Sequence, residues 1–137
     1  MPNVAIDSSF LYALFEPSDR AHADAKSLLA VLGANLITNL PVLTEVVYLL
    51  DYSVRAQRSV LKFAEFTLSI DRDTAGDLSR IAQIMDKYAD LPADFADASL
   101  IAMCERQHIG QIATLDRDFD VYRLANGQML TNRMAGP

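Results

Sequence analysis

The chain has 137 residues, about the length of one globular domain, and 51% of them are apolar, which excludes an intrinsically disordered protein. Its formal net charge of −6 argues against a protein that binds nucleic acid through a broadly basic surface. The single cysteine, Cys104, cannot form an internal disulfide. Its apolar neighbours predict that it lies in the core. A single cysteine without a disulfide partner favours a reducing compartment.

Nothing in the sequence indicates export or membrane insertion. No Lys or Arg precedes the N-terminal apolar run, and Asp7 interrupts that run, so we expect no secretory signal. The longest uncharged segment, residues 27–44, contains Gly33 and Pro41, which favour a helix end and a turn over a membrane span. The sequence therefore predicts a soluble, cytoplasmic protein.

Strands and helices are expected to alternate along the chain. Short apolar segments predict strands at 3–6, 35–38, 67–70, 111–115 and, as a short fifth strand, 128–130. Helical periodicity and capping residues predict helices at 8–15, 20–32, 42–52, 54–66, 74–88 and 95–107. This alternation favours a three-layer α/β/α fold with a short parallel sheet of four to five strands. We expect a single domain over residues 1–137, with a loose tail at 134–137.

Four acidic residues lie in apolar surroundings, in separate segments. Asp7 directly follows the first predicted strand and Asp116 the fourth, and ligands of parallel sheets bind at such strand ends. Glu45 and Asp97 lie in helices with mostly apolar neighbours. Isolated carboxylates lower stability when they are buried without a partner, and they repel one another if they converge. A divalent cation removes both costs, and Mg²⁺ and Mn²⁺ prefer oxygen ligands.

Helix capping offers another explanation for several of these acids. Asp94 and Asp97 have the spacing of an N-cap and an N3 residue, and Asp7 precedes a predicted helix. Asp116 is at the first position of a possible turn, residues 116–119, which it would cap. Glu45 has the weakest capping explanation, because it lies several residues inside its helix. Capping does not predict that the acids share one edge of the sheet, however.

Other chemistries have less support. The chain contains no glycine-rich phosphate loop, no nucleophile elbow and no histidine pair with metal-ligand spacing. A phosphatase with an aspartate nucleophile would have Asp-x-Asp after the first strand, where this chain has Asp7-Ser8-Ser9. A receiver-like phosphoacceptor domain would have a lysine near the site, and none follows Lys87. A non-catalytic metal-binding or interaction module with the same fold remains an open alternative.

Four segments together resemble a known family. "VAIDSSFLYALF", "LTEVVYLL", "LPADFADASLIAMCE" and "IATLDRDFDVY" are similar to the PIN-domain ribonucleases, most closely the VapC-type toxins of prokaryotic toxin–antitoxin pairs. The resemblance spans residues 7–122. It implies a PIN-like fold and a catalytic, metal-binding quartet made of Asp7, Glu45, Asp97 and Asp116. Asp94 and Asp118 match additional acids, and Ser8 and Thr114 match hydroxyl positions that orient a carboxylate or a water.

The resemblance also implies an activity and partners. One or two Mg²⁺ or Mn²⁺ ions would activate a water that cleaves an RNA phosphodiester bond, leaving a 5′-phosphate and a 3′-hydroxyl. A small antitoxin protein would block the acidic cleft. Arg117 next to the site is a candidate for phosphate contacts. So is a stripe of Arg55, Arg58 and Lys62 on a helix expected near the site, although basic stripes are also ordinary solvated surfaces. The apolar 8–15 helix fits either the core or a homodimer interface.

Overall fold

The predicted alternation of strands and helices is present in the computed structural model, which describes residues 1–134. In chain order the elements are β1 (Asn3–Ile6), α1 (Ser8–Phe15), α2 (His22–Val31), β2 (Asn35–Asn39), α3 (Leu40–Leu49), α4 (Val54–Phe66), β3 (Ser69–Asp71), the 3₁₀ turn η1 (Thr74–Asp77), α5 (Leu78–Lys87), α6 (Phe95–Gln107), β4 (Gln111–Ala113), η2 (Arg117–Asp120) and β5 (Thr131–Asn132). The bounds of α1 and α4 are those predicted from the sequence.

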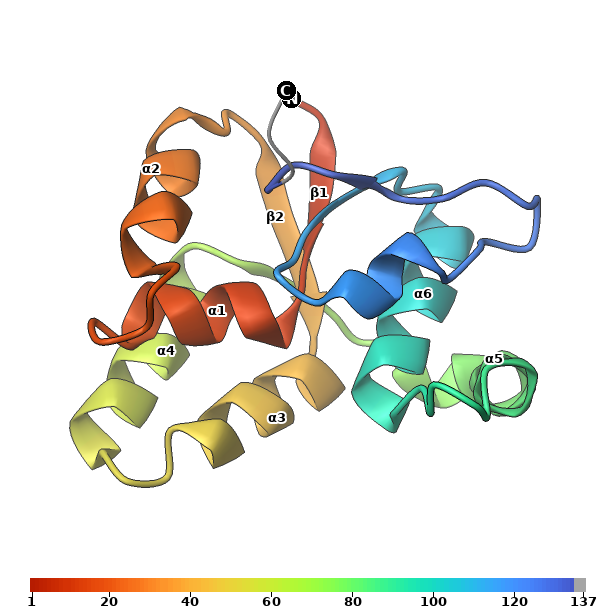
Figure 1. Ribbon diagram of the computed structural model, residues 1–137, viewed down its shortest axis with the longest axis horizontal. Helices are drawn as coiled ribbons and strands as arrows, with labels where there is room; N and C mark the ends of the chain where they lie inside the picture. The colour runs from red at the N-terminus through yellow and green to blue at the C-terminus, as the bar shows by residue number, and fades with distance from the viewer. Residues whose placement is uncertain (135–137) are drawn as a thin grey trace.

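The described strands form one parallel sheet in the order β3-β2-β1-β4-β5. Because parallel crossovers are right-handed, β1 to β3 place their connecting helices on one face, and the return from β3 to β4 places α5 and α6 on the other. Figure 1 shows this arrangement, with α1, α2 and α4 on one side of β1 and β2 and with α5 and α6 on the opposite side. The predicted three-layer α/β/α fold is confirmed.

The strand order reverses between β1 and β4, which are neighbours in the sheet. Outside the carboxyl ends of two such strands the connecting chains diverge to opposite faces and leave a crevice where ligands bind. The backbone N–H of Asp7, just after β1, donates to the carbonyl of Ala113 at the end of β4 (3.2 Å). The residues that follow these two strands therefore lie side by side.

The core lies between the sheet and both helix layers. Val4, Ala5 and Ile6 of β1 are fully buried, as expected of a central strand covered on both faces. Phe10 and Leu11 bury the apolar side of α1 within this same chain, so these residues belong to the core and not to an exposed interface. Cys104 is buried and free, as predicted. None of the helices within residues 1–134 has the length and apolar character needed to cross a membrane.

The chain segment after β4 differs from the prediction. The fifth strand pairs through Thr131 and Asn132, and the predicted segment 128–130 is not a strand. Leu130 is nevertheless buried, which shows that the apolar pattern indicated burial there and not strand pairing. Of the predicted loose tail, Met134 packs partly against the core, and residues 135–137 lie outside the described part of the chain.

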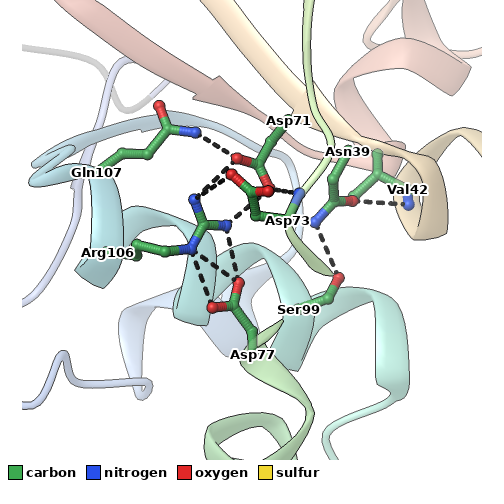
Figure 2. Close-up of polar contacts among 8 residues, drawn as sticks. All are labelled: Asn39, Val42, Asp71, Asp73, Asp77, Ser99, Arg106 and Gln107. Atoms are coloured by element: carbon green, nitrogen blue, oxygen red, sulfur yellow. Dashed lines mark hydrogen bonds and ion pairs between the residues drawn. The ribbon is translucent and has the colours of Figure 1, made fainter. Parts of the chain in front are cut away.

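Two polar contacts fix the junction of β2 and α3 against α6 (Figure 2). The side-chain oxygen of Asn39, which is fully buried, accepts the N–H of Val42 (3.1 Å) and caps α3. The side-chain N–H of Asn39 donates to the hydroxyl of Ser99 on α6 (3.1 Å). One amide thus both begins α3 and joins it to α6, the two helices that carry Glu45 and Asp97.

An ion-pair cluster fixes the other end of α6 (Figure 2). Arg106 donates to the carboxylates of Asp71 at the end of β3 (2.7 Å) and Asp77 in η1 (2.8 Å), both of which are buried. Gln107 also donates to Asp71 (2.6 Å). Burial raises the pKa of Asp71, but the hydrogen bonds from Arg106 and Gln107 outweigh it and hold the pKa below its ordinary value. Both ends of α6 are therefore anchored.

Replacing Arg106 with methionine is expected to lower the free energy of unfolding by roughly 2–3 kcal/mol, because two buried carboxylates lose their charged partner. The matched control is Arg80→Met, which removes a guanidinium that faces one carboxylate, that of Glu105. This control should cost less, about 1 kcal/mol. Urea unfolding at neutral pH measures both values, and equal losses in the two variants would contradict a special role for the Arg106 cluster.

Candidate active site

Asp7 lies at the base of the site, directly after β1. Its carboxylate is almost fully buried and caps α1, because its Oδ2 accepts the backbone N–H of Ser9 (3.4 Å). The same oxygen accepts the hydroxyls of Ser9 (2.8 Å) and Thr114 (2.7 Å). These donors hold Asp7 in one orientation. The capping role that the sequence suggested for Asp7 is therefore compatible with a place in the site.

The two hydroxyl groups on Asp7 also organise the chain after β4. The Thr114 hydroxyl accepts the backbone N–H of Asp116 (2.9 Å), and the Ser9 hydroxyl accepts that of Leu115 (2.9 Å). Asp116 in turn caps η2 by accepting the N–H of Asp118 (2.9 Å). The two strand ends are thus joined through side chains. Sequence reasoning missed Ser9, although an aspartate often accepts the backbone N–H two residues further on, which brings residue 9 to Asp7.

Glu45 enters the site from α3. It lies one turn and a half past the Asn39 cap, on the side of α3 that faces α1 and α6. The hydroxyl of Ser8, which is buried, donates to Glu45 Oε2 (3.0 Å) and lies 3.5 Å from Asp7 Oδ1. Ser8 therefore lies between the two carboxylates and keeps Glu45 directed toward the end of β1.

Asp97 lies in the first turn of α6. Asp94 is the N-cap of this helix, since its Oδ1 accepts the Asp97 N–H (2.8 Å), and its side chain is exposed. Asp97 itself is only 6% exposed. The hydroxyl of Tyr122 donates to Asp97 Oδ2 (3.0 Å). Sequence reasoning missed Tyr122, and no local pattern indicates it, because the contact joins segments 25 residues apart.

The acids form two groups of three that share Asp97. One oxygen from each of Glu45, Asp94 and Asp97 lies within 4.8 Å of the others, and the same holds for Asp97, Asp116 and Asp118. We call these the α3 triad and the η2 triad. Asp7 is in neither group. The structure thus brings three members of the predicted quartet together with both additional acids, and it places Asp7 beneath them.

Both triads suit a hard divalent cation. They offer only carboxylate oxygens, the ligand type that Mg²⁺ and Mn²⁺ prefer. Oxygens on opposite sides of one Mg²⁺ ion are about 4.2 Å apart, so small rotations of these side chains would let either triad hold one ion. Asp97 would be a ligand in both.

The raised pKa values of three acids show that their ionised forms are disfavoured in this site. Burial, followed by the charges of Asp7 and Asp94, raises the pKa of Asp97 to about 8. Burial and the charge of Asp94 raise the pKa of Glu45 to about 6. The pKa of Asp7 is also raised by burial, which outweighs its hydrogen bonds. A positive charge would favour the ionised form of each group, so the site is electrostatically prepared for a cation.

The basic candidates lie at different distances from the acids. Arg117 is exposed on η2, directly after Asp116. The stripe of α4, comprising Arg55, Arg58 and Lys62, lines a separate surface hollow. The ring of Phe63 on α4 packs against Phe15 at the C-terminal end of α1, whereas Asp7 caps the opposite end. The structure therefore places Arg117 beside the acids and does not bring the α4 stripe to them, contrary to the expectation of a helix near the site.

An apolar groove adjoins the α3 triad. It is lined by Leu40, Pro41, Thr44, Glu45, Tyr48, Asp94, Phe95 and Ala96. Tyr48 is 71% exposed and Phe95 is 44% exposed, so two aromatic rings face solvent beside the acids. The site thus combines an acidic centre with an apolar margin.

Comparison with known proteins identifies the family. The PIN-domain family model matches residues 4–124, which is most of the chain. The chain belongs to the PIN-domain family. Over 130 residues this PIN domain is 28% identical to ribonuclease VapC26 of Mycobacterium tuberculosis, a match that covers 92% of this chain and 96% of the relative. The predicted resemblance to VapC-type PIN domains is confirmed.

Solved structures agree on the fold of this PIN domain. It superposes on the crystal structure of Mycobacterium tuberculosis VapC20, a sarcin–ricin-loop-cleaving toxin, with a TM-score of 0.80 and 24% identity over 86% of this chain and 93% of that one. It also superposes, with a TM-score of 0.63 and 13% identity, on a chain of Rickettsia felis VapBC2 bound to a promoter DNA fragment, covering 87% of this chain and 92% of that one. At these identities both matches support the shared fold.

Proposed function

We propose that the protein is an endoribonuclease that requires Mg²⁺ or Mn²⁺ and acts in the cytoplasm as the toxin of a toxin–antitoxin pair. The observation that carries the proposal is the pair of carboxylate triads that share the buried Asp97 at the point where the strand order reverses. Membership of the PIN-domain family and the similarity to a relative named as a ribonuclease support it. We assign catalysis to Asp7, Glu45, Asp97 and Asp116, with Asp94 and Asp118 as further ligands.

The chain's own groups have distinct tasks in this proposal. A divalent ion held by the triads would lower the pKa of a bound water and stabilise the negative charge that develops on the attacked phosphate. Asp97 joins the two triads, and Ser8 keeps Glu45 directed toward them. Asp7, held by Ser9 and Thr114, adds negative charge below the triads and fixes the segment that carries Asp116. No side-chain nucleophile is required.

RNA and an antitoxin are the proposed partners. Arg117, exposed on η2 directly after Asp116, would contact a phosphate next to the acids. The exposed rings of Tyr48 and Phe95 would offer surfaces on which unpaired bases stack. Phosphate contacts by the α4 stripe would require an RNA long enough to extend past α1. A small cognate antitoxin would inhibit cleavage by covering the acids, and the VapBC2 complex among the structural relatives is consistent with such a partner.

RNA cleavage by the purified protein tests the proposal. A pool of structured RNAs is incubated at low salt with Mg²⁺, with Mn²⁺ or with a chelator. Asp7→Asn and Asp116→Asn should abolish cleavage, because each removes a charge from the centre. The matched control is Asp120→Asn, which changes an exposed acid of η2 that lies in neither triad. This control should cleave like the wild type.

The outcomes separate the proposal from its alternative. Cleavage that needs metal, fails in both site variants and survives in the control supports the nuclease. Mapping the cut ends should then give a 5′-phosphate and a 3′-hydroxyl. Binding of Mn²⁺ without cleavage of any RNA, including ribosomal RNA, would favour a non-catalytic metal-binding module. Absence of Mn²⁺ binding to the wild type would refute the metal site itself.

A further inference from the structure

Tyr122 makes a contact that the proposed reaction does not by itself require. Its hydroxyl is, within residues 1–134, the one side-chain donor to the carboxylate of Asp97. The carboxylates of Asp94 and Asp116 lie close to that of Asp97, one in each triad, and carry the same charge. The hydrogen bond from Tyr122 fixes the direction of one oxygen of the Asp97 carboxylate (3.0 Å). The contact therefore acts on the single residue that both triads share.

The ring of Tyr122 is held firmly in place. The residue is 3% exposed, and its ring packs edge-on against Phe119 (centroids 5.0 Å apart) and Tyr88 (5.1 Å). The hydroxyl of Tyr88 is engaged elsewhere, since it accepts the backbone N–H of Arg123 (2.8 Å). A ring packed in this way gives its hydroxyl little freedom, so the position of Asp97 Oδ2 is set by the aromatic cluster.

Tyr122 also joins the two walls of the site. Its backbone N–H donates to the carbonyl of Asp118 in η2 (3.1 Å), while its hydroxyl reaches Asp97 on α6. The residue therefore connects the segment that carries Asp116 and Asp118 to the helix that carries Asp97. Without this link, repulsion from the neighbouring carboxylates would favour rotation of Asp97 away from the triads.

We propose that Tyr122 is a positioning residue that holds Asp97 in the orientation that lets one carboxylate serve both triads. The inference rests on the proposed metal-dependent function. It is independent of which RNA is cleaved, because it concerns the geometry of the ligand set. Removing the hydrogen-bond partner of a metal ligand typically lowers metal affinity or activity about 10–100-fold.

The test uses two variants, each of which replaces one tyrosine of the aromatic cluster with phenylalanine and so removes only its hydroxyl group. Tyr122→Phe deletes the donor to Asp97 and keeps the packed ring. Tyr88→Phe is the matched control, because it deletes a hydroxyl of the same aromatic cluster that does not contact Asp97. Titration calorimetry with MnCl₂ measures the affinity of each protein. Thermal melting with a chelator measures the stability of each metal-free form.

We expect Tyr122→Phe to bind Mn²⁺ about tenfold or more weakly, and Tyr88→Phe to bind it like the wild type. Cleavage by Tyr122→Phe should need a correspondingly higher Mn²⁺ concentration for half-maximal rate and should recover as the metal saturates. A purely structural role of Tyr122 would instead lower the melting temperature and leave the Mn²⁺ affinity unchanged.

Two results would overturn the inference while the wild type binds Mn²⁺: equal Mn²⁺ affinity of Tyr122→Phe and the wild type, or an equal loss in Tyr88→Phe. Both would leave the proposed function standing. If the wild type itself binds no Mn²⁺, the proposed function fails and the inference fails with it. The wild-type titration therefore distinguishes the two failures.

Discussion

Replacing Asp97 with asparagine is expected to abolish metal-dependent RNA cleavage and, at the same time, to stabilise the metal-free protein. Cleavage should fall at least about 100-fold, because the variant loses the ligand that both triads share. Removing only a hydrogen-bond partner of a metal ligand already lowers metal affinity or activity by about 10–100-fold. The stability should rise because the buried Asp97 carboxyl, with a pKa of about 8, cannot ionise near neutral pH without a cost. Asparagine has no such cost and still offers an oxygen to Tyr122.

The expected gain in the free energy of unfolding is about 1–3 kcal/mol at pH 8, where the unfolded chain has this carboxyl ionised. Urea unfolding in the presence of a chelator measures it. Asp51→Asn provides the control, since it makes the same chemical change in an exposed side chain after α3 and should alter stability by less than about 0.5 kcal/mol. A less stable Asp97→Asn protein would show that the acids are not under electrostatic strain.

Opposite effects of one substitution on activity and stability are expected where a fold maintains an unfavourable charge arrangement for function. Helix capping accounts for part of the arrangement. Asp7, Asp94 and Asp116 each accept a backbone N–H at the start of a helix or 3₁₀ turn, so their positions also serve local structure. Within residues 1–134, Glu45 and Asp97 accept no backbone N–H of this kind, and the pKa of each is raised. Burial also raises the pKa of Asp7 despite its capping contact, so the unfavourable charge falls on Asp7, Glu45 and Asp97.

The sequence predicted the fold because local patterns determine most of its elements. The apolar run of β1, the Asn39 cap of α3 and the Asp94 cap of α6 each depend on residues that are close in the chain. The strand-end positions of Asp7 and Asp116 followed from the parallel sheet alone. The position of the short β5 was predicted wrongly. A two-residue strand is too short to show an alternating pattern, so the sequence does not distinguish strand pairing from the burial of the neighbouring Leu130.

Local sequence patterns do not indicate contacts between segments that are far apart in the chain. The division of the acids into two triads around Asp97, the location of Asp7 beneath them and the contact from Tyr122 all depend on how α6, η2 and the strand ends meet. The α4 stripe illustrates the same limit. Its spacing on one helix face is visible in the sequence, but its place at the far end of α1 follows from the packing of Phe63 on Phe15.

The metal-free protein is expected to lose about 2–4 kcal/mol of its free energy of unfolding as the pH rises from about 4.5 to 8.5. The pKa of Glu45 is raised to about 6 and that of Asp97 to about 8, and the pKa of Asp7 is raised as well. Between the ordinary carboxyl pKa and these values, the folded state binds more protons than the unfolded chain. Stability therefore falls with rising pH over this window. Urea unfolding at several pH values with a chelator measures the trend.

Below this window the trend should reverse. The pKa of Asp71 is lowered, through Arg106 and Gln107, so its contribution to stability is present above the ordinary carboxyl pKa and is lost as the pH falls toward the folded-state value. The metal-free protein should thus be most stable in mildly acidic solution. Added Mn²⁺ should restore the lost stability at pH 8 and change little at pH 5, because the ion binds ionised carboxylates and must displace their protons. Asp97→Asn should flatten the slope, and a metal-free wild-type protein whose stability stays constant up to pH 8.5 would show that the triads do not hold raised pKa values.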